Sequence, residues 1–330
     1  MGVMGGVRRP ITWSPSVTLV PTRACFNACG YCSFRRPLNP DQPLGDALSP
    51  LEAVRQLQQR PEAREVLLLS GEVPMDSGLR REWFLQLLRL SRLALAHGRL
   101  PHTNAGPLTL SEMAVLGRCN PSMGLMLEGL GRAYGRLHQA APSKTLVMRL
   151  QQLVQAGRLG IPFTTGLLLG VGETAQERSS ALELVAHLHR RWGHIQEVIL
   201  QPWRPDRPVP TPLSPAACEA LLPTIVEARR ILPPEVHLQL PANLWPLAAL
   251  PEALAAGIDD LGGIDVLDVI NPAYRQPTPE VLRRSLAAAG WELRPRLCVH
   301  HAWIPRLPAS LQRQVRALEQ SLARSGVVRV

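Results

Sequence analysis

Short runs with strand-like patterns of apolar residues alternate along the chain with longer segments whose apolar residues recur at helical spacing. The runs cover residues 16–22, 65–72, 100–104, 122–128, 162–170, 195–203, 236–241 and 258–264. A helical segment or a turn follows each run, and the first begins at Ser49, a capping residue followed by Pro50 at the first helical position. The run 65–72 is almost wholly apolar, as is typical of a strand buried on both faces of a parallel sheet.

Eight predicted strands, each followed by a helix or turn, favour a (βα)8 barrel, with an open doubly wound sheet as the alternative. No low-complexity linker interrupts the chain. We therefore expect a barrel over residues 1–272 and a helical C-terminal extension over residues 273–330 that packs on it.

The composition suits a globular enzyme in a reducing compartment, which predicts the cytoplasm. Of 330 residues 45% are apolar, but no apolar stretch reaches the length of about 18 residues that spans a membrane. The N-terminus does not read as a secretory signal. Three of the six cysteines are clustered, whereas Cys119, Cys218 and Cys298 stand in apolar contexts typical of buried thiols.

The net charge of +10 comes almost entirely from arginine, because Lys144 is the single lysine among 36 basic residues. No run of consecutive basic residues forms a nucleic-acid-binding tail. A solvated basic surface is therefore the expectation, and a specific role with nucleic acid is disfavoured.

Polar residues gather where the predicted strands end, and in a barrel the carboxyl ends of the strands meet at one face. In chain order they are the cysteine loop, Ser70-Gly71-Glu72, His102-Thr103-Asn104, Glu128, the segment 164–173, Gln201 with Arg204, Gln239 with Asn243, and Asp259-Asp260. A purely structural core would not place polar side chains at every such end. This pattern predicts an enzyme.

The loop "ACFNACGYCSF" (24–34) holds cysteines at 25, 29 and 32. Three thiolates suit zinc or an iron–sulfur cluster. A structural zinc site needs a fourth Cys or His, and the nearest downstream histidine is His102. A [4Fe–4S] cluster held by three cysteines leaves one iron open, as a catalytic cluster requires.

The spacing Cys25-x3-Cys29-x2-Cys32, with aromatic Tyr31 before the last cysteine, resembles the signature of the radical S-adenosylmethionine (SAM) enzymes. The resemblance implies that these cysteines ligate a [4Fe–4S] cluster. Ser70-Gly71-Glu72 resembles the glycine-rich motif in which Glu72 binds the methionyl ammonium, although Ser70 replaces a glycine. "GLLLGVGE" (166–173) resembles the stretch along the adenine, with Gly166, Leu168, Gly170 and Glu173. Glu128 and Arg149 resemble positions that hold the ribose and the carboxylate.

Within this superfamily, five blocks resemble the CofG enzymes of 7,8-didemethyl-8-hydroxy-5-deazariboflavin synthase. They are residues 101–106, 122–130, 156–174, 192–205 and 257–272. The resemblance implies a final oxidative cyclisation, with release of ammonia, of an adduct between a hydroxybenzyl group and 5-amino-6-ribitylaminouracil. It also implies a CofH-type partner enzyme that supplies the adduct and an acidic flavodoxin or ferredoxin that supplies the electron. Pro202 departs from the family pattern, which has Asn there.

The implied substrate contacts lie at or just beyond the predicted strand ends. They are His102, Asn104, Gln201, Arg204, Asn243, Asp259 and Asp260, and the candidate catalytic residues are Glu72, His102, Asn104 and Asp260. Structural roles are the alternative: His102 buried against a neighbouring strand, Arg149 facing solvent, and the two aspartates in a turn.

Two other functions stay open. One is another radical SAM enzyme of this group, either the CofH partner or a menaquinone-pathway cyclase. The other is a basic, zinc-stabilised nucleic-acid-binding protein.

Overall fold

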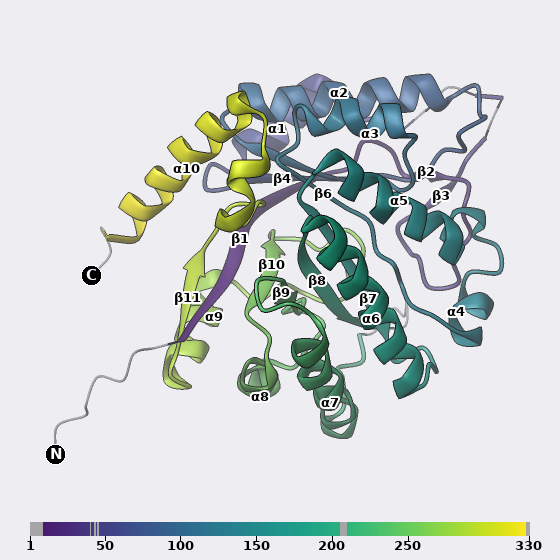
Figure 1. The fold of residues 1–330 in the computed structure, drawn as a ribbon. Helices are drawn as coiled ribbons and strands as arrows, with labels where there is room; N and C mark the ends of the chain where they lie inside the picture. Colours follow the sequence, from purple (N-terminus) through teal and green to yellow (C-terminus); the bar gives the residue numbers. More distant parts are fainter. Residues whose placement is uncertain (1–8, 40, 43, 45, 205–209, 328–330) are drawn as a thin grey trace, which may run out of the picture.

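The chain folds into a closed barrel of parallel strands in a computed structural model that describes residues 9–39, 41–42, 44, 46–204 and 210–327 (Figure 1). All eight predicted strands are present. They are β1 (Arg9–Leu19), β4 (Glu65–Leu69), β5 (Leu100–Asn104), β6 (Ser122–Gly124), β7 (Phe163–Leu169), β8 (Ile195–Pro202), β9 (His237–Gln239) and β10 (Asp260–Ile264). β10 pairs with β1, where Asp260 lies opposite Thr12. The sheet is therefore closed, and the open-sheet alternative is wrong.

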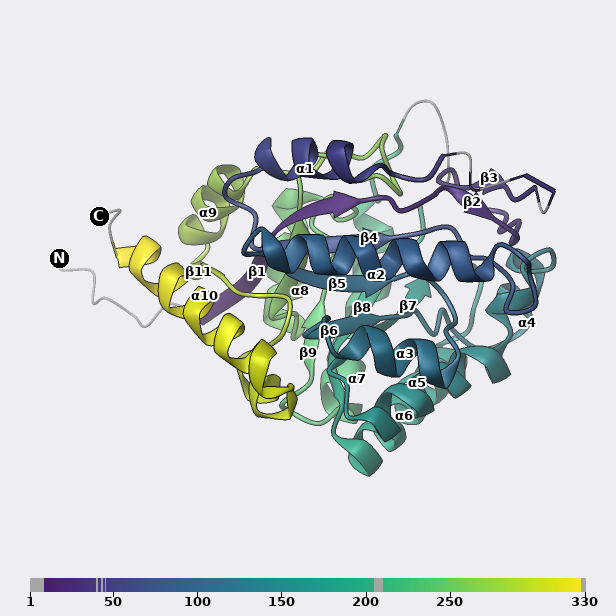
Figure 2. The same ribbon diagram turned by 90° about the horizontal axis from the view of Figure 1, so that it is seen from above.

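Helices surround the barrel, as seen from two directions in Figures 1 and 2. They are α1 (Pro50–Gln58), α2 (Arg80–Ala96), α3 (Leu110–Gly117), α5 (Leu146–Leu159), α6 (Ala175–Trp192), α7 (Pro215–Ile231) and α8 (Leu250–Ala256), with short helices α4 (Arg132–Leu137), η1 (Pro142–Lys144) and η2 (Leu247–Ala249). Their apolar faces cover the outward side chains of the strands. Val66 and Leu68 of β4, for example, share a core cluster with Leu90 and Ala94 of α2. Within the described residues, no helix has the length and apolarity to cross a membrane.

The C-terminal part comprises α9 (Pro279–Ala288), β11 (Trp291–Pro295), η3 (His301–Arg306) and α10 (Ala309–Val327). The helices agree with the predicted helical extension, whereas β11 was not predicted. This strand pairs in parallel with the first half of β1, up to Trp13 opposite Pro295, while β4 pairs with β1 from Ser16 onward. The residues that follow β11 pack against Leu100 at the start of β5. They therefore cover the amino-terminal face of the barrel, away from the cysteine loop with β2 and β3. The proposed boundary at residue 272 stays a prediction.

Asp259 and Asp260 lie at this amino-terminal face, so the prediction that they lie at a carboxyl strand end is wrong. Asp260 is the first residue of β10 and is fully buried. Its carboxylate accepts hydrogen bonds from Arg296 Nε at 2.5 Å and from Arg296 Nη2 at 2.6 Å. Asp259 bonds to His237 at the start of β9. The run 258–264 is too short for its pattern of residues to show where the strand begins, which explains the error.

Arg296 also donates to Glu197 at 2.6 Å and so joins two buried carboxylates. Glu197, Asp260 and His300 offer ligand atoms within 4.8 Å of one another, as a metal site would. The guanidinium already supplies the cation there. We therefore interpret this group as an internal ion-pair network that closes the barrel.

Candidate functional site

The cysteine loop lies on the carboxyl end of β4. The amide of Gly71 donates to the carbonyl of Thr22 at 2.8 Å, and the amide of Phe26 donates to the carbonyl of Glu72 at 3.0 Å. A Cβ at Gly71 would lie 2.1 Å from the carbonyl oxygen of Ala24. Gly71 is therefore needed for close packing of the loop itself, a use that the sequence analysis did not anticipate.

Two other segments support the loop from its sides. The amide of Ala28 donates to the carbonyl of Ala140, between α4 and η1, at 2.6 Å, and the amide of Gly30 donates to the carbonyl of Leu137, the last residue of α4, at 3.2 Å. The hydroxyl of Ser33 donates a hydrogen bond to the carbonyl of Ile270, beyond β10, at 3.0 Å. Within the loop, β2 (Ala24–Cys25) pairs with β3 (Arg36–Pro37). The loop is thus fixed at both ends and at two points between them.

The three cysteines of the loop are free and half-buried. Burial raises the pKa of Cys25, and it raises the pKa of Cys29 to about 11. A bound metal would supply the charge that stabilises the thiolates. A single metal ion needs ligand atoms that all lie within about 4.8 Å of one another. Among the described residues, the three sulfur atoms of the loop do not form such a group. A cluster takes its thiolates on separate irons, and the loop fits it better than a single zinc ion.

Glu72 follows β4 and lies beside the loop in a dense set of polar contacts. Arg149 Nη2 donates to its Oε1 at 3.1 Å, Asn27 donates to its Oε2 at 2.9 Å, and the Ser143 hydroxyl donates to the same oxygen. Burial alone would raise the pKa of Glu72, but Arg149, Lys144 and the bond from Ser143 lower it. The carboxylate is ionised and can attract an ammonium group.

Arg149 is the fourth residue of α5 and is almost fully buried. It does not face solvent, the alternative that the sequence left open. Its Nε has no hydrogen-bond partner among the described residues. A buried guanidinium with a spare donor suits a carboxylate, so the site fits the methionyl end of SAM.

Glu128 lies just past β6 and is buried, with a backbone φ of 74°. Lys144 forms an ion pair with this carboxylate, and the hydroxyl of Tyr31 donates to its Oε2 at 3.2 Å. A cavity of about 280 Å³ lies against Glu128 and Lys144 and is also lined by Tyr134 and His138. Non-glycine residues rarely adopt a positive φ, and when they do they cluster at ligand sites.

The predicted adenine stretch lies along β7 and the turn after it. Leu167 and Leu169 face the outer core, so Leu168 faces the barrel interior by the alternation of a strand. A Cβ at Gly166 would lie 2.4 Å from the carbonyl oxygen of Ile199, so this glycine is needed for packing. Glu173 accepts hydrogen bonds from the amides of Gly170 and Val171, both at 2.8 Å. Its carboxylate therefore shapes the turn.

Two other predicted residues have structural partners. The Ser70 hydroxyl accepts a hydrogen bond from Trp83 Nε1 of α2 at 3.1 Å, so its side chain faces the helix and not the barrel interior. His102 is buried, with Nδ1 2.7 Å from Ser122 Oγ, which itself donates to the carbonyl of Cys298. Burial lowers the pKa of His102 to about 3, so the ring is neutral. A substrate contact by His102 stays a prediction.

Asn104 ends β5 on the interior face that His102 shares, and Gln201 faces the interior from β8, because Val198 and Leu200 pack outward. Arg204 and Asn243 line one cavity of about 320 Å³ together with Tyr274. Asn243 Oδ1 and Arg204 Nε have no partners within the described ranges. Buried polar atoms of this kind favour a polar ligand.

Four further residues build this site and were not predicted from the sequence. Asn27 and Ser143 hold Glu72, and Lys144 pairs with Glu128. Gly106 has a φ of 86°, and a Cβ there would lie 2.4 Å from the Glu72 side chain. Only Lys144 carried a signal, as the single lysine of the chain.

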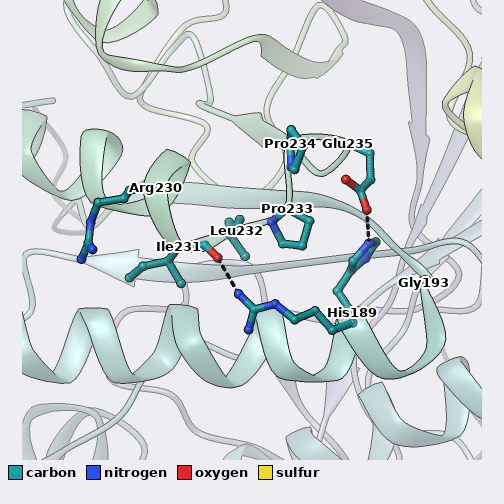
Figure 3. A pocket seen from close by; sticks show the side chains of 9 residues that line it. His189, Gly193, Arg230, Ile231, Leu232, Pro233, Pro234 and Glu235 are labelled. Atoms are coloured by element: carbon teal, nitrogen blue, oxygen red, sulfur yellow. Dashed lines mark hydrogen bonds and ion pairs between the residues drawn. The ribbon is translucent and has the colours of Figure 1, made fainter.

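A separate cavity of about 530 Å³ lies between α6 and α7 (Figure 3). His189 bonds there to Glu235 at 3.1 Å, and Arg190 donates to the carbonyl of Ile231 at 3.2 Å. These residues precede β8 and β9, at the amino-terminal face. The cavity is thus remote from the polar groups at the carboxyl ends.

We expect Glu72→Gln to weaken SAM binding about ten- to hundredfold, because a charge-assisted hydrogen bond contributes about 1.5–3 kcal/mol. Equilibrium titration of the reconstituted protein with SAM measures the change in the dissociation constant. Glu62→Gln, at an exposed position, is the control. Unchanged affinity would assign Glu72 a structural role only.

Comparison with known proteins agrees with this geometry. Residues 19–185 match the model of the radical SAM superfamily. The chain is 49% identical over 311 residues to 7,8-didemethyl-8-hydroxy-5-deazariboflavin synthase of Synechococcus elongatus, covering 93% of this chain and 91% of that protein. It is 47% identical over 314 residues to the synthase of Thermosynechococcus vestitus, and this match covers 94% of this chain and 98% of that protein.

The fold resembles that of the FeFe-hydrogenase maturase HydG from Carboxydothermus hydrogenoformans, with a TM-score of 0.68, 20% identity and coverage of 94% of this chain and 77% of that one. Because the superfamily model matches half of the chain and the curated relatives match nearly all of it, the chain belongs to the radical SAM superfamily and, within it, to the 7,8-didemethyl-8-hydroxy-5-deazariboflavin synthase family.

Proposed function

We propose that the chain converts 5-amino-5-(4-hydroxybenzyl)-6-(D-ribitylimino)-5,6-dihydrouracil to 7,8-didemethyl-8-hydroxy-5-deazariboflavin, with release of ammonia, as a carbon–nitrogen lyase. The observation that carries this proposal is the identity of 47–49% over more than nine-tenths of the chain to enzymes of that name. The polar groups at the carboxyl ends of the strands support it.

The family implies a [4Fe–4S] cluster and SAM. In our proposal Cys25, Cys29 and Cys32 ligate the cluster and leave one iron open to the methionyl amine and carboxylate. When bound, the cluster and SAM supply the radical chemistry of the superfamily. Glu72 binds the ammonium group, and Arg149 offers its free donor to the carboxylate.

The remaining proposed contacts orient the nucleoside and the substrate. Glu128 accepts from the ribose, and Leu168 and Gly170 lie along the adenine. Asn104, Gln201, Arg204 and Asn243 bind the uracil and ribityl groups. Such fixing matters because a primary carbon radical attacks most C–H bonds, so the substrate must be held and water excluded.

A CofH-type enzyme would supply the adduct, and an acidic flavodoxin or ferredoxin would supply the electron. Arg23 and Arg36 lie on either side of the cysteine loop in the sequence, and Arg36 is exposed. A basic surface at this place suits an acidic donor, since complementary charge raises the rate of encounter.

An anaerobic assay with dithionite, SAM and the synthetic adduct tests the proposal. We expect formation of the deazaflavin and release of ammonia. Formation of the adduct itself from tyrosine and 5-amino-6-ribitylaminouracil would instead identify a CofH-type activity. Stoichiometric zinc without iron or sulfide after anaerobic purification would contradict both.

We expect Asn104→Ala to keep the cluster and SAM cleavage but to lose most deazaflavin formation, because the substrate is misplaced while the SAM contacts remain. The ratio of deazaflavin to 5′-deoxyadenosine measures this effect. Gln151→Ala, at an exposed position of α5, is the control. A wild-type ratio in the Asn104 variant would remove this residue from the substrate site.

A further inference from the structure

Lys144 occupies a position that its charge alone does not explain. It is the only lysine in a chain whose other 35 basic residues are arginines. It ends η1, and its side chain is only 13% exposed. The ammonium group bonds to the Glu128 carboxylate and donates to the hydroxyl of Tyr31 at 2.9 Å. A solvated surface lysine does not hold a buried carboxylate and a half-buried phenol in this way.

The two partners of Lys144 come from different walls of the site. Tyr31 belongs to the cysteine loop and precedes Cys32 directly. Glu128 is held against β7 by two backbone bonds, from its own amide to Gly166 at 3.1 Å and from the Leu168 amide to its carbonyl at 2.8 Å. Tyr31 also donates to the second oxygen of Glu128 at 3.2 Å. Lys144, Tyr31 and Glu128 therefore form a closed triangle of contacts between the two walls.

The triangle leaves Glu128 able to bind a ligand. A carboxylate has about four acceptor positions, and Lys144 and Tyr31 take one on each oxygen. The remaining positions suit the hydroxyls of a ribose. Burial alone would raise the pKa of Glu128, and Lys144 is the main group that lowers it, so the carboxylate is ionised.

We propose that Lys144 is a positioning residue that links Tyr31 of the cysteine loop to Glu128, so that the cluster-binding loop and the ribose-binding wall keep one relative geometry. This inference rests on the proposed function, because it assumes that a cluster and SAM occupy the site.

The geometry also explains why an arginine would not serve. An ammonium group is compact and directs three donors tetrahedrally, whereas a guanidinium is planar and carries five N–H groups that need partners. Lys144 and Arg149 are close enough for their charges to repel, and Arg149 already holds Glu72 on the other side. A second guanidinium would bring donors without acceptors into a buried site.

The test uses the reconstituted protein and the variants Lys144→Met, Tyr31→Phe, the double variant and Lys144→Arg. Three measurements are compared: iron content, SAM affinity by calorimetry, and the electron paramagnetic resonance spectrum of the reduced cluster with and without SAM. Arg158→Met is the control, because it removes an exposed positive charge from the next helix.

We expect Lys144→Met to retain the cluster but to bind SAM about ten- to hundredfold more weakly, the loss typical of a hydrogen bond to a charged group. The spectral change on adding SAM should differ from that of the wild type. Tyr31→Phe should act in the same direction, the double variant should be no worse than Lys144→Met, and Lys144→Arg should not restore affinity.

Additive effects in the double variant would overturn the proposal, because Lys144 would then act without Tyr31. Behaviour of Lys144→Met like that of Arg158→Met would overturn it too, and so would full affinity in Lys144→Arg. Failure of the wild type to hold a cluster or bind SAM is a different result, which would count against the proposed function itself.

Discussion

A Cys25→Ala protein should lose the cluster and all SAM cleavage, and so should Cys29→Ala and Cys32→Ala. The three half-buried thiols lie in one loop that is tied to β4, to the α4–η1 segment and to the residues after β10. Two remaining thiolates cannot hold a four-iron cluster firmly. Iron and sulfide analysis after anaerobic reconstitution, with the visible absorption spectrum, measures the loss.

Cys218→Ala is the matched control, because Cys218 is a buried thiol that lies on α7 in the apolar core. That variant should keep the brown chromophore. A Cys25→Ala protein with full iron content and full activity would refute the assignment of the loop as the cluster site.

Arg296→Met should destabilise the protein by about 3–5 kcal/mol, the usual cost of leaving buried charges without their partner. Arg296 holds Asp260 at 2.5 Å and Glu197 at 2.6 Å, and all three side chains are at least 90% buried. Denaturant unfolding at neutral pH measures the loss. Arg294→Met is the control two residues away, because Arg294 is exposed and forms its ion pair with the half-buried Glu292.

This destabilisation should shrink at acid pH, because Glu65, whose charge Arg296 also stabilises, is then neutral and no longer needs the guanidinium. Glu65 is a buried carboxyl group that interacts electrostatically with Arg296, Glu197 and Asp260. Burial raises its pKa to about 7, although Arg296 lowers it. A raised carboxyl pKa contributes stability that is complete below about 4.5 and is lost as the pH rises through about 7. Equal stability of the Arg296 and Arg294 variants at neutral pH would show that the network does not stabilise the fold.

Much of the barrel could be predicted because its signals are local. A buried parallel strand needs a short apolar run, and a helix needs a cap and helical spacing, so the eight strands and their helices follow from neighbouring residues. The cysteine loop was equally visible, because its ligands lie within eight residues. β11 could not be predicted in this way, because "WELRP" contains two charged residues and a proline, and it joins the sheet through backbone bonds to β1, 282 residues earlier.

The partners of the site residues depend on the closed barrel. Glu72 and Arg149 are 77 residues apart, and Asn27 and Ser143 are 116 apart, so no local pattern pairs them. The same holds for Arg296 and Asp260, whose contact shows that Asp260 begins its strand and belongs to the amino-terminal face. Local pattern determined the order of the elements and the ligand loop. Closure of the sheet decided which polar side chains share a buried space. It brings together residues far apart in the sequence, and a buried charge is stable only when such a partner lies beside it.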